Sequence, residues 1–263
     1  MTKMGFLAFA SLAVLAAVQD TSPHSDLSLS VVAVEPGVSC TILARIKLDP
    51  DWHCYWVNPG DSGMPTTFDI KVPKGYKAEE PSWSIPHRLI SQGATAFGYE
   101  NEALALVKIM TPRAGIKSNA VVEFSGTWLV CQQQCEMASQ SVKLDLSKAP
   151  SMRERRGVPS SLESKFPLPD VGRMAESASM KDGKYRIHLS PTMTFDKGSI
   201  QFLPRDPGVT DHKEAKVEAV LAGHVMVLEP SPYSDKPAKH LTGLLVFKRD
   251  GFDQALRISL PIR

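Results

Sequence analysis

Two cysteines lie between two stretches in which apolar and polar side chains alternate. Cys131 and Cys135 are separated by three glutamines, and the alternation covers roughly residues 121–130 before them and 136–146 after them. A period of two is typical of strands with one buried face. The sequence therefore predicts a β-hairpin that reverses around residues 132–134, with one cysteine at the end of each strand.

The predicted hairpin determines whether the two cysteines lie close enough to form a disulfide. On one extended strand they would lie about 13 Å apart, at ~3.3 Å per residue, and no bond could form. Across a short loop they face each other at about 4.5–5.5 Å, which a disulfide can span. So small a ring stabilises a fold by only roughly 2 kcal/mol on the chain-entropy model. The spacing leaves three interpretations open: a redox pair, a structural bridge and a metal site.

The rest of the chain predicts an all-β protein. Short alternating stretches recur from residue 29 to 146, and 20 prolines and 17 glycines punctuate the whole chain. About seven short strands favour an antiparallel β-sandwich. A second β pattern begins near Tyr185 and predicts a second, smaller β-sandwich. We expect a signal peptide over 1–18, a first β domain over 19–147, a linker over 148–180 and a second β domain over 181–263.

The N-terminus is typical of an exported protein. Lys3 precedes an apolar run from Met4 to Val18, and small residues at Ala16 and Ala17 offer cleavage sites. The run is shorter than the ~20 residues of a spanning helix, although an uncleaved anchor stays an alternative. Export implies an oxidising compartment, in which disulfides persist. With 30 basic and 28 acidic residues, the charge balance gives no sign of a nucleic-acid partner.

The other two cysteines are expected to be buried free thiols. Cys54 has the opposite strand parity to His53 and Tyr55, so it should face the core. A disulfide between Cys40 and Cys54 would need an irregular strand pairing. Buried thiols of this kind behave as small, inert hydrophobic side chains.

Two longer motifs resemble a known family. They are Trp52-His-Cys-Tyr-Trp-Val-Asn-Pro-Gly-Asp-Ser-Gly-Met-Pro-Thr-Thr67 and Trp128-Leu-Val-Cys-Gln-Gln-Gln-Cys135. Together they resemble the periplasmic N-terminal domain of the DsbD/ScsB family of thiol–disulfide interchange proteins. The resemblance covers about residues 29–147, and Leu241 to Phe247 is weakly similar to the second β domain of ScsB-type members.

The resemblance implies an immunoglobulin-like domain whose cysteine pair carries electrons. Cys131 and Cys135 match the family's redox pair, and Cys135 would make the first contact with a partner. His53 and Tyr55 would be the supporting residues beside the pair, although each also fits as a simple packing residue. The counterpart of the family's cap loop would be residues 95–99, with Phe97 and Tyr99; an ordinary turn with two packed aromatic residues is the alternative.

We therefore predict a periplasmic module that passes reducing equivalents by thiol–disulfide exchange, as a thiol–disulfide oxidoreductase without a cofactor. Its expected partners are thioredoxin-like periplasmic proteins and a separate membrane electron donor, because the sequence ends after the second β region. Two alternatives stay open. One is a copper-tolerance module that binds Cu(I) through Cys131, Cys135 and Met137, since soft sulfur ligands suit that ion. The other is a non-catalytic interaction domain.

Overall fold

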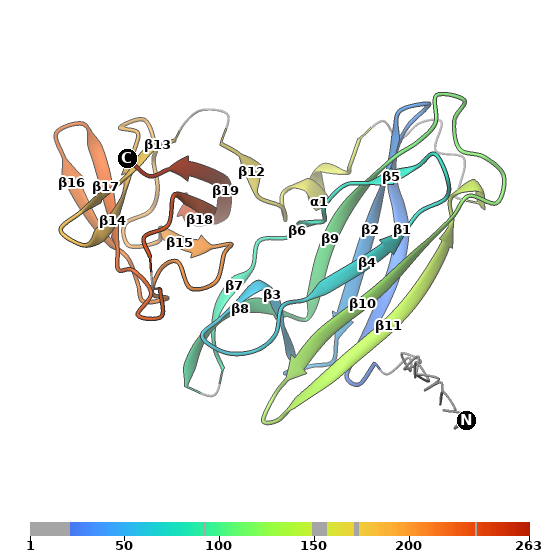
Figure 1. Ribbon diagram of the computed structural model, residues 1–263, viewed down its shortest axis with the longest axis horizontal. Helices are drawn as coiled ribbons and strands as arrows, with labels where there is room; N and C mark the ends of the chain where they lie inside the picture. The colour runs from blue at the N-terminus through green and yellow to red at the C-terminus, as the bar shows by residue number, and fades with distance from the viewer. Residues whose placement is uncertain (1–21, 92, 149–156, 171–173, 235) are drawn as a thin grey trace, which may run out of the picture.

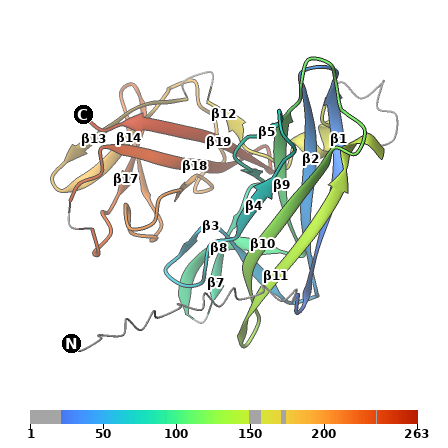
Figure 2. The ribbon, with the colours of Figure 1, turned by 45° about the vertical axis from the view of Figure 1, so that its right-hand side comes forward.

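The computed structural model describes residues 22–91, 93–148, 157–170, 174–234 and 236–263. Strands dominate this part of the chain, and they form four mostly antiparallel sheets. Figure 1 and Figure 2 show the sheets as two sandwiches side by side, so the predicted all-β fold is confirmed. The expected signal segment, residues 1–18, lies outside the described residues. None of the helices that the structure describes has the length and apolar character needed to span a bilayer.

One sheet of the first sandwich begins with a long hairpin. Strands β1 and β2 pair with each other, β2 pairs with β9, and the short strands β5 and β6 pair with β9. Their bounds are β1 Ser25–Glu35, β2 Ser39–Leu48, β5 Lys77–Ala78, β6 Ser82–Trp83 and β9 Glu102–Met110.

The other sheet of the first sandwich contains both cysteine-bearing strands. Its order is β11-β10-β3-β8-β7, and β4 also pairs with β10. The bounds are β3 His53–Gly60, β4 Thr67–Lys71, β7 His87–Ser91, β8 Ala94–Glu100, β10 Val121–Cys131 and β11 Cys135–Asp145. Strand β3 runs past Asn58, and its pairing with β8 is irregular between Tyr55 and Gly60.

The C-terminal sandwich is built from two four-stranded sheets, with orders β12-β19-β18-β15 and β13-β14-β17-β16. The first contains β12 Leu168–Pro169, β15 Gln201–Pro204, β18 His240–Arg249 and β19 Phe252–Pro261. The second contains β13 Ala175–Lys181, β14 Lys184–Leu189, β16 Lys216–Val220 and β17 Gly223–Leu228.

Alternating side chains build each core. On β10, Val122, Phe124, Trp128 and Val130 are fully buried, as their shared parity predicts. They belong to the core between the two sheets of the first sandwich. A second core, which includes Tyr185 and Leu245, fills the C-terminal sandwich. Such buried apolar surface, at about 25 cal/mol per Å², is the main stabilising term of both sandwiches.

The stretch expected to be a linker contains regular structure. Among its described residues, α1 (Ser160–Glu163), β12 and β13 are formed, and 3₁₀ helix η1 (Leu146–Lys148) precedes it. Phe166 is buried against Val32, Leu43 and Leu104 of the first sandwich, whereas β12 pairs with β19 of the second. This stretch therefore contacts both sandwiches, and the domain limits given above stay a prediction.

The two sandwiches contact each other directly. Leu203 and Leu244 of the C-terminal sandwich pack into the core of the first. The amide of Asn58 donates a 2.8 Å hydrogen bond to the carbonyl of Pro204, and Arg205 forms an ion pair with Glu80. These contacts place the C-terminal sandwich against the end of β3 and the segment between β5 and β6.

Candidate functional site

The cysteine pair closes the tip of the β10–β11 hairpin. Cys131 and Cys135 are direct partners in the strand register, their Cα atoms are 4.1 Å apart, and their sulfurs form a disulfide. The backbone N–H of Gln132 donates to the carbonyl of Gln134, which closes the three-residue turn. The predicted reversal at residues 132–134 and the facing cysteines are both present.

The two sulfurs belong to residues with very different exposure. Cys131 is fully buried, whereas Cys135 and the three glutamines of the turn are exposed. Cys131 packs with Tyr55 and Ala96 in a small cluster separate from the main core. A partner that approaches the hairpin tip therefore reaches Cys135 before Cys131.

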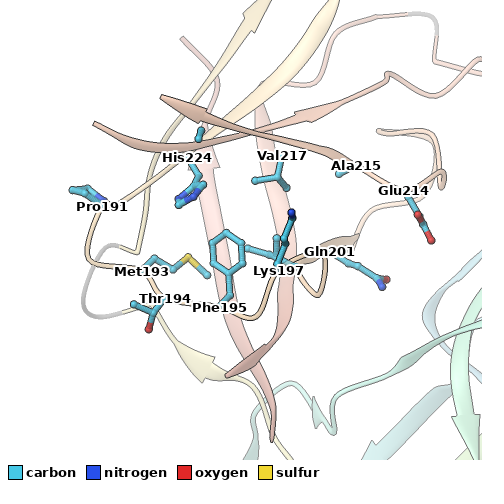
Figure 3. A pocket seen from close by; sticks show the side chains of 13 residues that line it. Pro191, Met193, Thr194, Phe195, Lys197, Gln201, Glu214, Ala215, Val217 and His224 are labelled. Carbon is cyan, nitrogen blue, oxygen red and sulfur yellow. The ribbon is translucent and has the colours of Figure 1, made fainter. Parts of the chain in front are cut away.

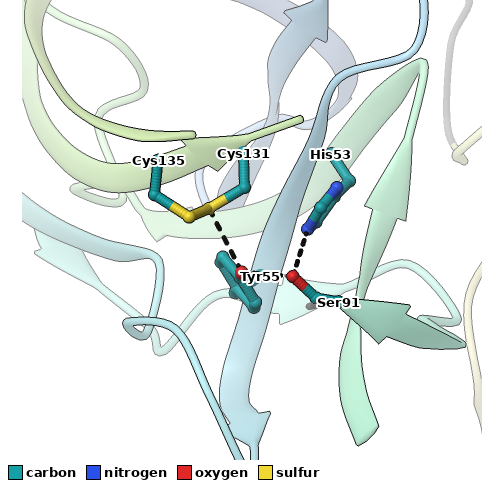
Figure 4. Close-up of a disulfide and its surroundings, with 5 residues drawn as sticks. All are labelled: His53, Tyr55, Ser91, Cys131 and Cys135. Atoms are coloured by element: carbon teal, nitrogen blue, oxygen red, sulfur yellow. Dashed lines mark hydrogen bonds between the residues drawn. A yellow bond between two sulfur atoms is a disulfide. The ribbon is translucent and has the colours of Figure 1, made fainter. Parts of the chain in front are cut away.

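Tyr55 is the polar neighbour of the buried cysteine. Its hydroxyl donates a 3.2 Å hydrogen bond to Sγ of Cys131. Strand β3 places it there because Cys131 pairs with His53, and Tyr55 shares the parity of His53. The two rings meet edge to face, with centroids 5.4 Å apart. The structure thus brings both predicted supporting residues to the disulfide, as Figure 4 shows.

Ser91 completes a chain of hydrogen bonds that the sequence did not reveal. Its Oγ lies 3.2 Å from the Tyr55 hydroxyl and 3.2 Å from Nε2 of His53 (Figure 4). Since the only hydroxyl proton of Tyr55 points to Cys131, Ser91 must donate to Tyr55, and Nε2–H of His53 must donate to Ser91. The chain therefore connects half-buried His53 with the buried sulfur.

Burial lowers the pKa of His53 below its ordinary value, and the negative charge of Glu100 on β8 opposes that shift. The imidazole is consequently neutral near neutral pH. A neutral ring that carries its proton on Nε2 is the form that the hydrogen bond to Ser91 needs. His53 acts on Cys131 only through Ser91 and Tyr55, because no direct contact joins it to the sulfur in the described hydrogen bonds.

The connection after β3 holds Tyr55 from the other side. Gly63 lies against the ring, where a Cβ would come within 2.3 Å of Cε1 of Tyr55. The hydroxyl of Thr66 donates a 2.5 Å hydrogen bond to the backbone carbonyl of Tyr55. Both residues belong to the longer family-like motif that begins at Trp52, so this motif encloses the tyrosine.

The expected cap loop at residues 95–99 needs correction. These residues form part of strand β8, and the side chains of Phe97 and Tyr99 are buried in the main core. The hydroxyl of Tyr99 donates to the carbonyl of Ser84, and burial raises its pKa well above the ordinary value. Strand alternation turns Ala96, not Phe97, toward Cys131. The two aromatic residues therefore support the sheet and do not lie over the disulfide.

Cys40 and Cys54 are free and buried, as predicted. Burial raises the pKa of Cys40 to about 11 and that of Cys54 to about 12. The thiolate is the reactive form of cysteine, so both groups are unreactive in the folded protein.

Met137, the third candidate copper ligand, is exposed on β11 and pairs in register with Leu129. It shares the strand parity of Cys135, so both side chains lie on the same face of the sheet. Among the described residues, no group of three or more His, Cys, Asp or Glu side chains could hold a metal ion.

A cavity of about 780 Å³ lies in the C-terminal sandwich, apart from the disulfide. Figure 3 shows Met193, Phe195 and Val217 in its wall, with the ring of His224 edge-on to Phe195. No cysteine lines the cavity. Its wall combines apolar side chains with Lys197, Glu214 and His224, as in many binding pockets.

Comparison with known proteins gives a family for the first sandwich and a fold for the whole chain. Residues 25–146 match the family described as "Thiol:disulfide interchange protein DsbD, N-terminal". The crystal structure of the N-terminal periplasmic domain of ScsB from Proteus mirabilis is 16% identical, with a TM-score of 0.62. The match covers 91% of this chain and 94% of that one, so the likeness extends over both sandwiches.

Other solved structures are similar to this chain only at low TM-scores. The periplasmic chaperone SfaE is 7% identical over 90% of this chain and 100% of that one, but its TM-score is only 0.21. No curated protein matches the chain. The family match, the ScsB-like fold and the disulfide at the hairpin tip agree with one another, and residues 25–146 of the first sandwich are similar to DsbD N-terminal domains.

Proposed function

We propose that this protein is a periplasmic thiol–disulfide exchange module that passes reducing equivalents through Cys131 and Cys135. The observation that carries the proposal is the asymmetry of the disulfide: one cysteine is exposed at a hairpin tip, and the other is buried beneath a tyrosine hydroxyl. The family match supports a thiol–disulfide interchange module, and the periplasmic ScsB domain supports the location.

Reduction of the module begins at the exposed sulfur. A thiolate of a donor protein attacks Sγ of Cys135, a new S–S bond forms between donor and module, and the Cys131–Cys135 bond breaks. Cys131 leaves as a thiolate, which the Tyr55 hydroxyl stabilises by its hydrogen bond. The second donor thiol then attacks the mixed disulfide and releases Cys135. The donor ends as a disulfide, and the module has gained two electrons and two protons.

Delivery of the electrons is the reverse sequence. The Cys135 thiolate attacks the disulfide of an acceptor, and Cys131 then attacks Sγ of Cys135 and releases the reduced acceptor. The chain from His53 through Ser91 to Tyr55 offers a route by which a proton reaches or leaves the buried sulfur. We infer that the exchange partners are thioredoxin-like proteins of the same compartment and that a separate membrane protein supplies the electrons.

Trapping of mixed disulfides tests this proposal. In Cys131→Ser, the exposed Cys135 remains and no resolving thiol is left, so a mixed disulfide with a thioredoxin-like partner should accumulate. In Cys135→Ser, only the buried sulfur remains, and the yield should be much lower. The partner used should lack its own resolving cysteine and should carry its remaining cysteine as a mixed disulfide with a small thiol, which leaves when Cys135 attacks the partner's sulfur. If neither variant forms a mixed disulfide with such a partner, the exchange function is wrong.

A further inference from the structure

We infer that the C-terminal sandwich holds the redox tyrosine in place, and that His212 is a positioning residue for Tyr55. The inference rests on the proposed function in one respect, because it takes the Cys131–Cys135 pair to be redox-active. It assigns a role to the sandwich that lies outside the family match of residues 25–146.

The connection after β3 determines where Tyr55 lies. Gly63 leaves no room for the tyrosine ring to move toward it, and Thr66 bonds the carbonyl of Tyr55. Thr66 is itself 1% exposed. A displacement of residues 58–66 would therefore displace the hydroxyl that contacts Cys131.

The C-terminal sandwich anchors both the end of β3 and the connection that follows it. Nδ1 of His212 lies 2.7 Å from a carboxylate oxygen of Asp61, two residues before Gly63. The amide of Asn58 bonds the carbonyl of Pro204, and its side-chain oxygen accepts the N–H of Gly60. Two side-chain bonds thus cross from one sandwich to the other within four residues.

His212 is buried against the first sandwich. The residue is only 7% exposed, and its ring meets Phe97 of β8 edge-on, with centroids 5.1 Å apart. Its Nε2 is buried and finds no hydrogen-bond partner among the described residues. A buried polar atom without a partner is costly, so an apolar side chain would fill this place at lower cost if packing were its only role. The imidazole provides a hydrogen bond to the carboxylate of Asp61, which an apolar side chain could not form.

The contact with Phe97 adds a second point of support. Phe97 lies next to Ala96, and Ala96 packs with Tyr55 and Cys131. The N–H of Asp61 also donates to the carbonyl of Thr95 on the same strand. His212 therefore contacts both the connection after β3 and strand β8, the two elements that flank Tyr55. Without it, the tyrosine hydroxyl would spend less time within reach of Sγ of Cys131.

The consequence is thermodynamic and can be measured on the full chain. A tyrosine hydroxyl fixed near Cys131 stabilises the thiolate, and hence the reduced form of the pair. Loosening it shifts the equilibrium with glutathione toward the disulfide. We expect His212→Ala to shift the equilibrium constant about three- to tenfold, in the same direction as Tyr55→Phe. His212→Asn, which keeps an N–H donor near the position of Nδ1, should restore most of the shift.

A matched control comes from the same interface. Arg257 donates a 2.9 Å hydrogen bond to Oγ of Ser82, so it also joins the two sandwiches, but this bond goes to β6 and not to residues 58–66. Arg257→Ala should leave the redox equilibrium unchanged, although it also removes a hydrogen bond between the sandwiches. His212→Ala should have no further redox effect in a Tyr55→Phe background, because the two residues act in series.

Three results would overturn the inference. They are an unchanged equilibrium in His212→Ala, an equal shift in Arg257→Ala, and a full additional shift in the double variant with Tyr55→Phe. The equilibrium with glutathione can be measured whether or not any thioredoxin-like protein reacts with the pair. Failure of this inference is therefore distinguishable from failure of the trapping experiment that tests the proposed function.

Discussion

The hydroxyl of Tyr55 donates a hydrogen bond of 3.2 Å to Sγ of Cys131, across a separation of 76 residues in the sequence. This contact joins the central strand of one sheet to the redox hairpin, and it makes the two sulfurs chemically unequal. Cys131 is buried and hydrogen-bonded, whereas Cys135 is exposed. In the proposed exchange, Cys131 is therefore the leaving group and Cys135 is the site of attack.

Tyr55→Phe should shift the redox equilibrium of the pair toward the disulfide by about tenfold, because a hydrogen bond to a charged acceptor is worth roughly 1.5–3 kcal/mol. Equilibration with glutathione buffers measures the shift. Tyr76→Phe is the matched control, since the hydroxyl of Tyr76 accepts the N–H of Lys117 far from the cysteine pair. The account is contradicted if both variants shift the equilibrium equally.

His53 should titrate below its usual pKa of about 6.5, because burial disfavours its charged form. The folded state then binds a proton less readily than the unfolded chain, so the free energy of unfolding falls as the pH drops below about 6.5. Denaturant unfolding at several pH values should show a smaller fall for His53→Gln than for the wild type. Equal falls would contradict the assigned shift.

Nitrogen NMR of His53 at neutral pH should show the neutral ring with its proton on Nε2, because the hydrogen-bond chain needs a donor there. Ser91→Ala removes the acceptor and should allow the two tautomers to mix. A ring that carries its proton on Nδ1 in the wild type would disprove the direction of the chain.

Gly63→Ala should disturb the redox site as well as the fold. Gly63 has φ of +97°, and an added Cβ would collide with the ring of Tyr55. Gly115→Ala is the control, since Gly115 has φ of +88° but open space around its Cα. Both variants should lose about 1 kcal/mol or more from backbone strain. Only Gly63→Ala should change the equilibrium with glutathione, and a matching change in Gly115→Ala would count against the role of this connection.

In the native oxidised protein, thiol reagents should label neither Cys40 nor Cys54, because burial raises the pKa of both thiols. Mass spectrometry should find two labels per chain after unfolding without reductant, and none before. Rapid labelling of Cys54 in the folded state would show that strand β3 opens readily.

Local patterns in the sequence predict part of this fold well. The alternation on either side of the glutamines is enough to predict the β10–β11 hairpin, and parity alone places Cys54 in the core and Tyr55 on the other face. These features depend on neighbours within one strand or one hairpin, where the period of two leaves few choices.

Other features depend on distant contacts. Ser91 has no unusual local sequence, and it becomes part of the site only because β7 pairs with β8 and β8 with β3. The resemblance to the family implied a cap loop at Phe97 and Tyr99, but both residues lie in β8. Gly98 between them pairs with Tyr55, and a Cβ there would lie 2.1 Å from the carbonyl oxygen of Cys54. The contact between His212 and Asp61 spans 151 residues, beyond any local pattern.

The reduction potential of the Cys131–Cys135 pair tests the central claim most directly. Equilibration of the full chain with glutathione or with thioredoxin, followed by quantification of free thiols, gives the value. The account predicts a potential near that of thioredoxin, about −270 mV, or less negative, since an exchange module must be oxidised and reduced by such partners. A potential well below about −300 mV would mark an inert structural bridge and contradict the account.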